Sequence, residues 1–193
     1  SNFQQMRDYL EGDPRFEGIR GDKKAVVLSW TRKEFSNLQR ATAAGVRVPE
    51  PIAVQRNVLV MELIGQEGDA ASKLSDVDVE NPETAYDVIR EYMRRLYSAG
   101  LVHGDLSEYN VVVYEGELVV IDVGQAVTVH HPSSDDFLRR DCQNVANFFA
   151  REGADADPGD LYDYITSHAD PTTEGDKGAA GEHEQLRDDD SGE

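Results

Sequence analysis

Two short β-branched runs face each other across a two-residue turn, and polar residues flank their outer ends. The runs are Val111–Tyr114 and Glu117–Ile121, and Glu115-Gly116 between them favours the tight turn of a β-hairpin. Asn110 stands just before the first run, and Asp122 just after the second. Because a hairpin returns the chain to its starting edge, we expect these two side chains to lie beside each other. The fold must therefore present a polar pair at the mouth of a hairpin.

A third oxygen-bearing side chain, Asp105, lies five residues before Asn110 in the segment His103-Gly-Asp-Leu-Ser-Glu-Tyr-Asn110. Mg²⁺ binds carboxylate and amide oxygens together with phosphate oxygens. Asn110 and Asp122 can hold such an ion while Asp105 accepts a hydroxyl proton, which is the division of roles described for kinases. Taken singly, each is more often a loop residue that hydrogen-bonds within a turn. Their convergence favours a phosphoryl-transfer site, and His103 is predicted to hold the loop.

Helical periodicity surrounds this segment. Pro82–Ala99 is predicted to be a helix that is capped by Asn81 and stopped by Gly100. Thr31–Ala44 is predicted to be a second helix, with Gly45 as its stop. The remaining expected elements are an apolar strand over 25–30, two strands at Val54 and Val58–Ile64 that turn near Arg56, a polar connector over 65–81, and helices at 134–150 and 158–167.

The catalytic-loop segment, followed by Ile121-Asp-Val-Gly-Gln125, resembles the RIO family of atypical serine/threonine protein kinases, in its Rio-one branch. Further matching segments occur in order: Lys33-Glu-Phe-Ser-Asn-Leu38, Val48-Pro-Glu-Pro-Ile52, Val58-Leu-Val-Met-Glu-Leu-Ile-Gly65 and Phe137-Leu-Arg-Arg-Asp-Cys-Gln-Asn-Val145. The resemblance spans roughly residues 3–165. It implies an α+β, two-lobed protein-kinase-like fold with an incomplete N-lobe and a helical C-lobe that carries the catalytic-loop hairpin.

Roles for single residues follow from this resemblance. Asp105 resembles the proton acceptor, and Asn110 and Asp122 resemble the Mg²⁺ ligands. The aspartate that matches Asp122 is also thought to take the phosphate itself, as an aspartyl-phosphate in an ATPase cycle. Three positions match the adenine site: Glu62 and Ile64 through the hinge backbone, and Met61 as the residue that lines the pocket behind it.

Two helix residues have alternative interpretations. Glu34 matches the glutamate that pairs with an ATP-binding lysine in kinases, but Thr31-x-x-Glu34 also fits a capping box. Asp141 resembles the aspartate that braces the catalytic loop, but it also suits a plain exposed charge. Cys142 is predicted to be a core residue.

The sequence departs from the family before its first predicted helix. No glycine-rich loop occurs there, and the lysines of Lys23-Lys24-Ala25-Val26 precede the expected strand instead of ending it. Since the chain begins with Ser1, we expect the first strands to be missing and this chain alone to bind ATP weakly. The predicted division is a partial N-lobe over 1–64, a C-lobe with the catalytic loop and metal site over 65–169, and a disordered acidic tail over 170–193.

The charge of the chain limits its partners and its setting. The 38 Asp and Glu residues against 19 Lys and Arg residues give a net charge of −19, which argues against broad nucleic-acid binding. So acidic a surface, poor in lysine, suggests a salt-adapted protein, because molar salt screens self-repulsion. The family resemblance adds that the member it resembles is archaeal. No apolar run of about 18 residues and no signal peptide is evident, so no membrane span is expected. A single cysteine suits a cytoplasmic location.

Three functions compete at this point. The first is a RIO-type serine/threonine kinase or ATPase that uses ATP and Mg²⁺ and acts on a protein substrate or a pre-ribosomal small-subunit particle, a role that only the resemblance implies. The second is a small-molecule phosphotransferase of the aminoglycoside-kinase type, which shares a His-Gly-Asp-Leu loop. The third is an inactive kinase-like binding module, because the glycine-rich loop and the ATP lysine are absent from this chain.

Overall fold

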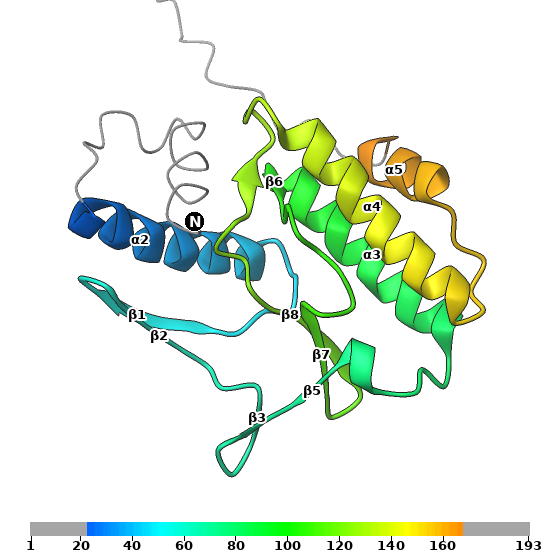
Figure 1. Ribbon diagram of the computed structural model, residues 1–193, viewed down its shortest axis with the longest axis horizontal. Helices are drawn as coiled ribbons and strands as arrows, with labels where there is room; N and C mark the ends of the chain where they lie inside the picture. Colours follow the sequence, from blue (N-terminus) through cyan, green and yellow to red (C-terminus); the bar gives the residue numbers. More distant parts are fainter. Residues whose placement is uncertain (1–22, 168–193) are drawn as a thin grey trace, which may run out of the picture.

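The computed structural model describes residues 23–167, in which one long helix and a β-hairpin lie beside a body of three helices and short strands (Figure 1). The predicted disordered tail over 170–193 and the segment before residue 23 lie outside the described residues. Over the span from 23 to 167, no helix combines the length and the apolar character that crossing a membrane requires.

The first described helix, α2, runs from Lys23 to Ala43. The predicted strand over 25–30 is therefore wrong, because these residues form the first turns of α2. No glycine or proline interrupts the helix, and Val26, Leu38 and Ala41 are all buried. Burial of this face outweighs the β-preference of the valines near its start, since propensity is a weak prior next to packing.

Thr31 lies inside α2 and not at its start. Its hydroxyl donates a hydrogen bond to the Val27 carbonyl oxygen at 2.9 Å, one turn back in the helix. The alternative of a capping box at Thr31 and Glu34 is therefore wrong. The end of the helix is as predicted: Gly45 has a φ of 79°, and the amides of Gly45 and Val46 return to carbonyls of the last turn.

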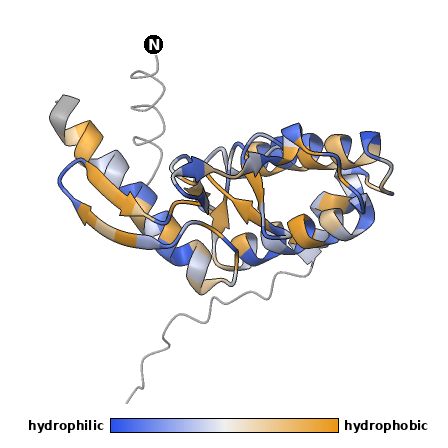
Figure 2. Cartoon of the chain, turned by 90° about the horizontal axis from the view of Figure 1, so that it is seen from below, coloured by the Kyte–Doolittle hydropathy of each residue, from blue (hydrophilic) through white to orange (hydrophobic). Residues whose placement is uncertain are grey.

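Strands β1 (Pro51–Gln55) and β2 (Val58–Met61) form an antiparallel hairpin that lies against α2. The turn falls near Arg56, as predicted, but β2 ends at Met61 and does not reach its predicted end. Figure 2 shows both strands as mostly apolar along their length. Even so, Ile52 is 62% exposed and Val58 is 56% exposed. This hairpin thus has one face toward α2 and much apolar surface outside any core.

The predicted polar connector contains several very short elements. They are β3 (Gly65–Gln66), β4 (Asp69–Ala70), β5 (Ser72–Lys73) and the 3₁₀ helix η2 (Leu74–Asp76). β3 and β4 pair with each other, whereas β5 pairs antiparallel with β7. The connector is therefore attached to the sheet that carries the predicted site.

Three helices form the C-terminal layer, and all three were predicted: α3 (Pro82–Ser98), α4 (Ser134–Arg151) and α5 (Pro158–Ser167). The Asn81 side chain accepts a hydrogen bond from the Thr84 amide at 3.2 Å, which confirms the predicted N-cap. Gly100, with a φ of 80°, ends α3 as predicted. In Figure 1, α4 and α5 lie beside α3, and the three pack against one another.

The predicted hairpin consists of β7 (Val111–Tyr114) and β8 (Glu117–Val120). Glu115 and Gly116 both have positive φ, 50° and 77°, as a type I′ turn requires. Two further strands, β6 (Leu101–Val102) and β9 (Val127–Thr128), pair with each other and enclose the loops at the hairpin mouth. A single buried cluster joins α2 to this body; among its members are Leu38, Val48, Ile89, Val120 and Phe149.

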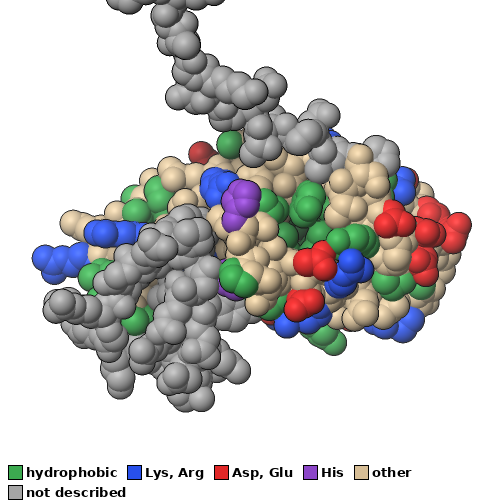
Figure 3. All heavy atoms as spheres, turned by 90° about the horizontal axis from the view of Figure 1, so that it is seen from above, with side chains coloured by type: hydrophobic (Ala, Val, Ile, Leu, Met, Phe, Trp, Pro, Cys, Tyr) green, Lys and Arg blue, Asp and Glu red, His purple; other side chains and the backbone are tan. Residues whose placement is uncertain are grey.

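Acidic side chains are grouped on part of the surface. Figure 3 shows several of them at the end of the molecule where α4 connects to α5, and Glu152, Asp155, Asp157 and Asp160 are exposed there. Salt adaptation of this surface stays a prediction.

Candidate active site

The hairpin mouth brings Asn110 and Asp122 together, as the strand lengths predicted. Val111 pairs with Val120, and the Ile121 amide donates to the Asn110 carbonyl oxygen at 2.9 Å, so the ladder extends one step past the strands. Asp122 follows immediately with a φ of 58°, a left-handed conformation that is uncommon for an aspartate. The chain thus turns sharply at the residue whose carboxylate the prediction singled out.

Asp105 joins this pair through two side-chain amides. The Asn110 Nδ2 atom donates to the Asp105 carbonyl oxygen at 2.7 Å and so fixes the loop between them. Gln125 Nε2 donates to Asp105 Oδ2 at 3.2 Å and lies 3.5 Å from Asp122 Oδ2. All three predicted residues therefore meet at one place. Gln125, which links the two carboxylates, was part of the matching segment but had been given no role.

The loop that carries Asp105 is held from beneath by α4. Asp141 Oδ2 accepts from the Gly104 amide at 2.8 Å, and Oδ1 accepts from the Leu106 amide at 2.9 Å. Asp141 is 1% exposed, so the alternative of a plain exposed helix charge is wrong. Burial raises the pKa of Asp141 to about 6, while the hydrogen bonds from the two amides act to lower it. Asp141 braces the loop without reaching its outer face.

His103 holds the same loop from the other side, as predicted. It is buried, its Nε2 atom lies 3.1 Å from the Ile121 carbonyl oxygen, and its Nδ1 atom accepts from the Asp105 amide at 3.2 Å. An accepting Nδ1 places the proton on Nε2, which then donates to Ile121. His103 thereby joins the loop before Asp105 to the strand end before Asp122.

Cys142, the next residue along α4 from Asp141, is a buried core residue as predicted, and burial raises its pKa to about 12.

Asn37 ties α2 to the loop that follows Asp122. The side chain is fully buried, and its Nδ2 atom donates to the carbonyl oxygens of Val123 at 2.9 Å and Ala126 at 3.2 Å. Asn37 was not among the predicted functional residues. A polar residue beside Leu38, on the buried face of a helix, was the available signal.

Glu34 lies close to the same loop. A Cβ atom at Gly124 would be only 3.4 Å from the Glu34 carboxyl carbon and 3.3 Å from Trp30 Nε1, so glycine permits this close approach. Burial raises the pKa of Glu34, and the negative charge of Asp122 raises it further. In the described part of the chain, no lysine or arginine forms an ion pair with Glu34. Its predicted pairing with a lysine stays a prediction.

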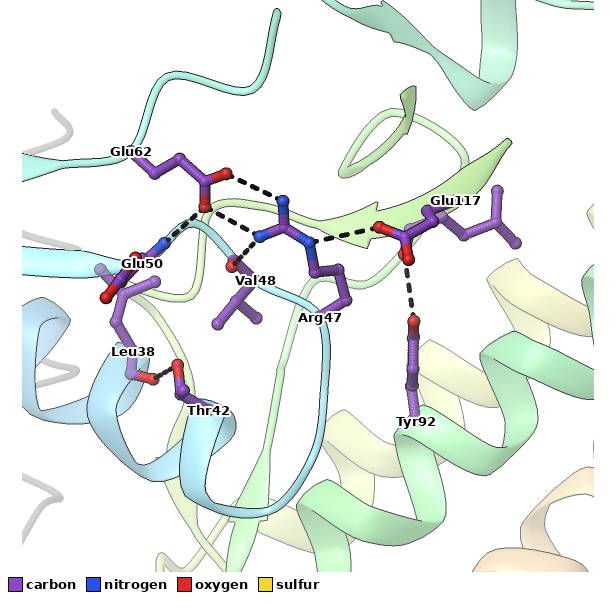
Figure 4. Close-up of polar contacts among 9 residues, drawn as sticks. Leu38, Thr42, Arg47, Val48, Glu50, Glu62, Tyr92 and Glu117 are labelled. Atoms are coloured by element: carbon purple, nitrogen blue, oxygen red, sulfur yellow. Dashed lines mark hydrogen bonds and ion pairs between the residues drawn. The ribbon is translucent and has the colours of Figure 1, made fainter. Parts of the chain in front are cut away.

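The predicted hinge segment connects β2 to the rest of the chain. The Glu62 carboxylate receives two hydrogen bonds of 2.8 Å from Arg47 and one of 3.0 Å from the Glu50 amide (Figure 4). These contacts lower the pKa of Glu62 to about 2, with the Arg47 hydrogen bonds as the largest cause. The Glu62 carboxylate is therefore occupied by Arg47 and the Glu50 amide. Any contact of Glu62 with a nucleotide would use its backbone, as the resemblance implied.

Two backbone groups of this segment are not used in backbone hydrogen bonds within the described part of the chain and could therefore bond to an adenine ring. Among residues 23–167, neither the Glu62 carbonyl oxygen nor the Ile64 amide takes part in a backbone hydrogen bond, although the Glu62 amide and the Ile64 carbonyl do. Met61, just before them, is 41% exposed. The geometry is compatible with the adenine contacts, which stay a prediction.

The donor set at the hairpin mouth fits Mg²⁺. Within the described residues, no three His, Cys, Asp or Glu side chains are arranged to hold a metal ion. Asp122 and Asn110 instead offer one carboxylate and one amide, and Mg²⁺ usually keeps few protein ligands and takes phosphate oxygens besides. The carboxylates of Asp105 and Asp122 share one donor, Gln125, and Glu34 adds to the negative field. A cation would relieve this concentration of charge.

The fold is α+β and protein-kinase-like. Three features define it: a loop aspartate braced from a helix, an asparagine and an aspartate paired at a hairpin mouth, and a segment that connects a strand pair to a helical body. Residues 1–161 match the family model of the RIO domain. The chain belongs to the RIO domain family.

Curated relatives agree with this assignment. The chain is 67% identical over 177 residues to the RIO-type serine/threonine-protein kinase Rio1 of Haloferax volcanii, covering 92% of this chain and 61% of that protein. It is 42% identical to the protein of the same name from Thermoplasma acidophilum, covering 84% of this chain and 86% of that protein. The chain thus spans less than two thirds of the Haloferax relative. These matches favour the protein-kinase interpretation over the aminoglycoside-kinase alternative.

Solved structures of Rio2 kinase from Chaetomium thermophilum share the fold. One, described as an ADP/Mg²⁺–phosphoaspartate complex, has a TM-score of 0.64 and 28% identity and covers 73% of this chain and 44% of that chain. The other has a TM-score of 0.66 and 27% identity and covers 82% of this chain and 51% of that chain.

Proposed function

We propose that this chain carries the phosphoryl-transfer residues of an ATP-dependent RIO-type serine/threonine protein kinase or ATPase. The observation that carries the proposal is the contact of Gln125 Nε2 with both Asp105 and Asp122. It places a candidate base and a candidate metal ligand within reach of one side chain. The named activity of the Rio1 relatives supports the same function.

In this proposal Asp105 accepts the proton of the substrate hydroxyl at a carboxylate oxygen. Its loop is held by Asp141 from α4 and by His103, so the carboxylate needs little reorganisation to meet a hydroxyl group. Asn110 and Asp122 would hold Mg²⁺, which supplies charge neutralisation for phosphate oxygens when bound. The Glu62 carbonyl and the Ile64 amide would orient the adenine ring, and Met61 would line the pocket behind it.

Asp122 has a second proposed role as phosphate acceptor. An Asp122 carboxylate oxygen would bond to the γ-phosphorus of ATP, the bond between that phosphorus and its bridging oxygen would break, and ADP would leave. Water would then release phosphate and restore the carboxylate. The phosphoaspartate named for the Rio2 structure supports this route.

The wider setting rests on the family resemblance alone. We propose that the intact protein acts in the cytoplasm on a protein substrate or on a pre-ribosomal small-subunit particle, in small ribosomal subunit maturation. An inactive binding module is the competing proposal, and turnover decides between them.

Trp30 allows binding and chemistry to be tested separately, because it is the single tryptophan of the chain and lies against Gly124. ATP with Mg²⁺ is titrated while Trp30 fluorescence is recorded, and transfer of labelled γ-phosphate to casein and release of free phosphate are followed in parallel. Asp105→Asn should lower turnover of the intact protein by about 10² to 10⁴, while the fluorescence titration of this chain stays the same. Asp76→Asn, a change at an exposed residue outside the site, is the matched control. Unchanged turnover in Asp105→Asn would remove Asp105 from the role of base.

A further inference from the structure

A cavity of about 550 Å³ lies on the chain away from the three catalytic candidates. It is bounded by the loop before α3, by the first turns of α3 and by the turn end of the β7–β8 hairpin. Its apolar lining includes Val79, Val88 and Leu118, and its acidic lining consists of Asp78, Glu80 and Glu117. Asp105, Asn110 and Asp122 do not line it. The volume lies in the usual range for a ligand pocket.

The charge of this cavity is one-sided. Among residues 23–167, no lysine, arginine or histidine lines it. Asp78 and Glu80 are exposed, and within residues 23–167 neither forms an ion pair or a hydrogen bond through its carboxylate. Glu117 has only a 3.6 Å contact with Arg47 Nε, and its side chain is 65% exposed (Figure 4). Two carboxylates are therefore available to a ligand, and a third is weakly engaged.

The start of α3 offers few free amides to an anion. Helix N-termini attract anions through free amides, but Pro82 has no N–H group. The Thr84 amide is bonded to the Asn81 side chain, and the Ala85 amide to the Asn81 carbonyl. The cavity consequently favours a cationic ligand over an anionic one.

We propose that this cavity binds a basic peptide segment of a partner protein, with an aliphatic side chain on the apolar floor and Lys or Arg side chains against Asp78 and Glu80. Peptide recognition commonly joins an apolar pocket to a few well-placed polar groups. Charge complementarity selects this occupant and disfavours the acid-rich residues 170–193 of the chain itself. The site goes beyond the proposed phosphoryl transfer, because no catalytic candidate contributes to it.

The test uses a fluorescently labelled peptide, Arg-Lys-Gly-Leu-Ala-Leu, titrated with the whole chain while anisotropy is measured. We expect saturable binding that weakens when KCl is raised from 0.1 M to 1 M, since the Debye length falls from about 10 Å to about 3 Å. The double variant Asp78→Lys with Glu80→Lys should lower affinity at least tenfold. Asp76→Lys, a charge reversal in the same loop but outside the cavity lining, should leave affinity unchanged. Val88→Ser should lower it about fivefold through lost apolar contact.

Several results would overturn the proposal. They are equal binding by the double variant, equal binding of a peptide with Glu in place of Arg and Lys, and preferential binding of a peptide that copies residues 182–193. Concentration-dependent dimerisation that the double variant abolishes would make a second copy the occupant instead. Amide NMR gives an independent readout: the peptide should shift Thr84, Val113 and Leu118 and leave Asp105 and Gln125 unmoved, and the reverse pattern would place it at the active site.

Discussion

The β1–β2 and β7–β8 hairpins are built from similar residues but are held in different ways. The β7–β8 hairpin has Val119 and Val120 fully buried, and its mouth is bonded to α2 and to the catalytic loop, which α4 holds in turn. The β1–β2 hairpin leaves Ile52 and Val58 more than half exposed and is fixed at its base by the Arg47–Glu62 pair. Local strand propensity is alike in the two, so tertiary hydrogen bonds and burial are what separate a rigid site from a loosely covered strand pair.

The largest expected effect is at Asp141, the brace of the rigid region. Asp141→Ala leaves the buried amides of Gly104 and Leu106 without acceptors, so we expect the free energy of unfolding to fall by about 3–5 kcal/mol. Chemical denaturation measures it. Asp136→Ala removes an exposed carboxylate near the start of the same helix and should cost less than about 1 kcal/mol. Equal losses of unfolding free energy in the two variants would contradict the role of Asp141 in holding the loop.

The pH dependence at Asp141 follows from its raised pKa. Between about pH 4 and 6 the folded state holds a proton there that the unfolded state has lost, so stability from this group rises as pH falls and is lost as pH rises through about 6. Compared with Asp141→Asn, which does not titrate, the wild type should gain at most about 3 kcal/mol between pH 7 and pH 4. A stability difference that stays constant with pH would exclude this titration.

An intermediate effect is expected at Asn37, which extends the rigid region to α2. Asn37→Ala removes two buried hydrogen bonds, so a loss of about 2–3 kcal/mol in unfolding free energy is expected, together with a change in Trp30 fluorescence. Gln39→Ala, at an exposed position of the same helix, is the control and should change neither quantity. If Asn37→Ala lowered stability no more than Gln39→Ala, α2 would not be locked to the loop.

The smallest change in unfolding free energy is expected for the exposed β1–β2 hairpin. A buried position in the β7–β8 hairpin gives the comparison. Ile52→Thr should change unfolding free energy by less than about 0.5 kcal/mol, since the side chain is already exposed to water. Val119→Thr buries a hydroxyl in the core and should cost about 1–3 kcal/mol. Thermal and denaturant unfolding of the two variants measure the contrast. A costly Ile52→Thr would show that this face is covered.

Local signals allowed much of the fold to be predicted. Asn81 and Gly100 delimit α3, and Glu115-Gly116 turns the site hairpin, because caps and tight turns depend on neighbouring residues. The start of α2 was missed because its valines favour strands, whereas burial of the helix face prevailed.

For the site, the hairpin geometry was sufficient to bring Asn110 and Asp122 together and to place Asp105 near them. The contacts of Asn37 with Val123, and of Arg47 with Glu62, join segments whose approach depends on the whole fold. No local pattern encodes them. The catalytic, metal-binding and hinge roles, the predicted division into lobes and the pairing of Glu34 stay predictions.

The Asn37 bond has a mechanical consequence. Because α2 is fastened to the loop after Asp122 and shares its core with α3 and α4, a rotation of α2 has to displace that loop as well. Displacement of α2 and displacement of the loop after Asp122 are therefore coupled through the Asn37 side chain.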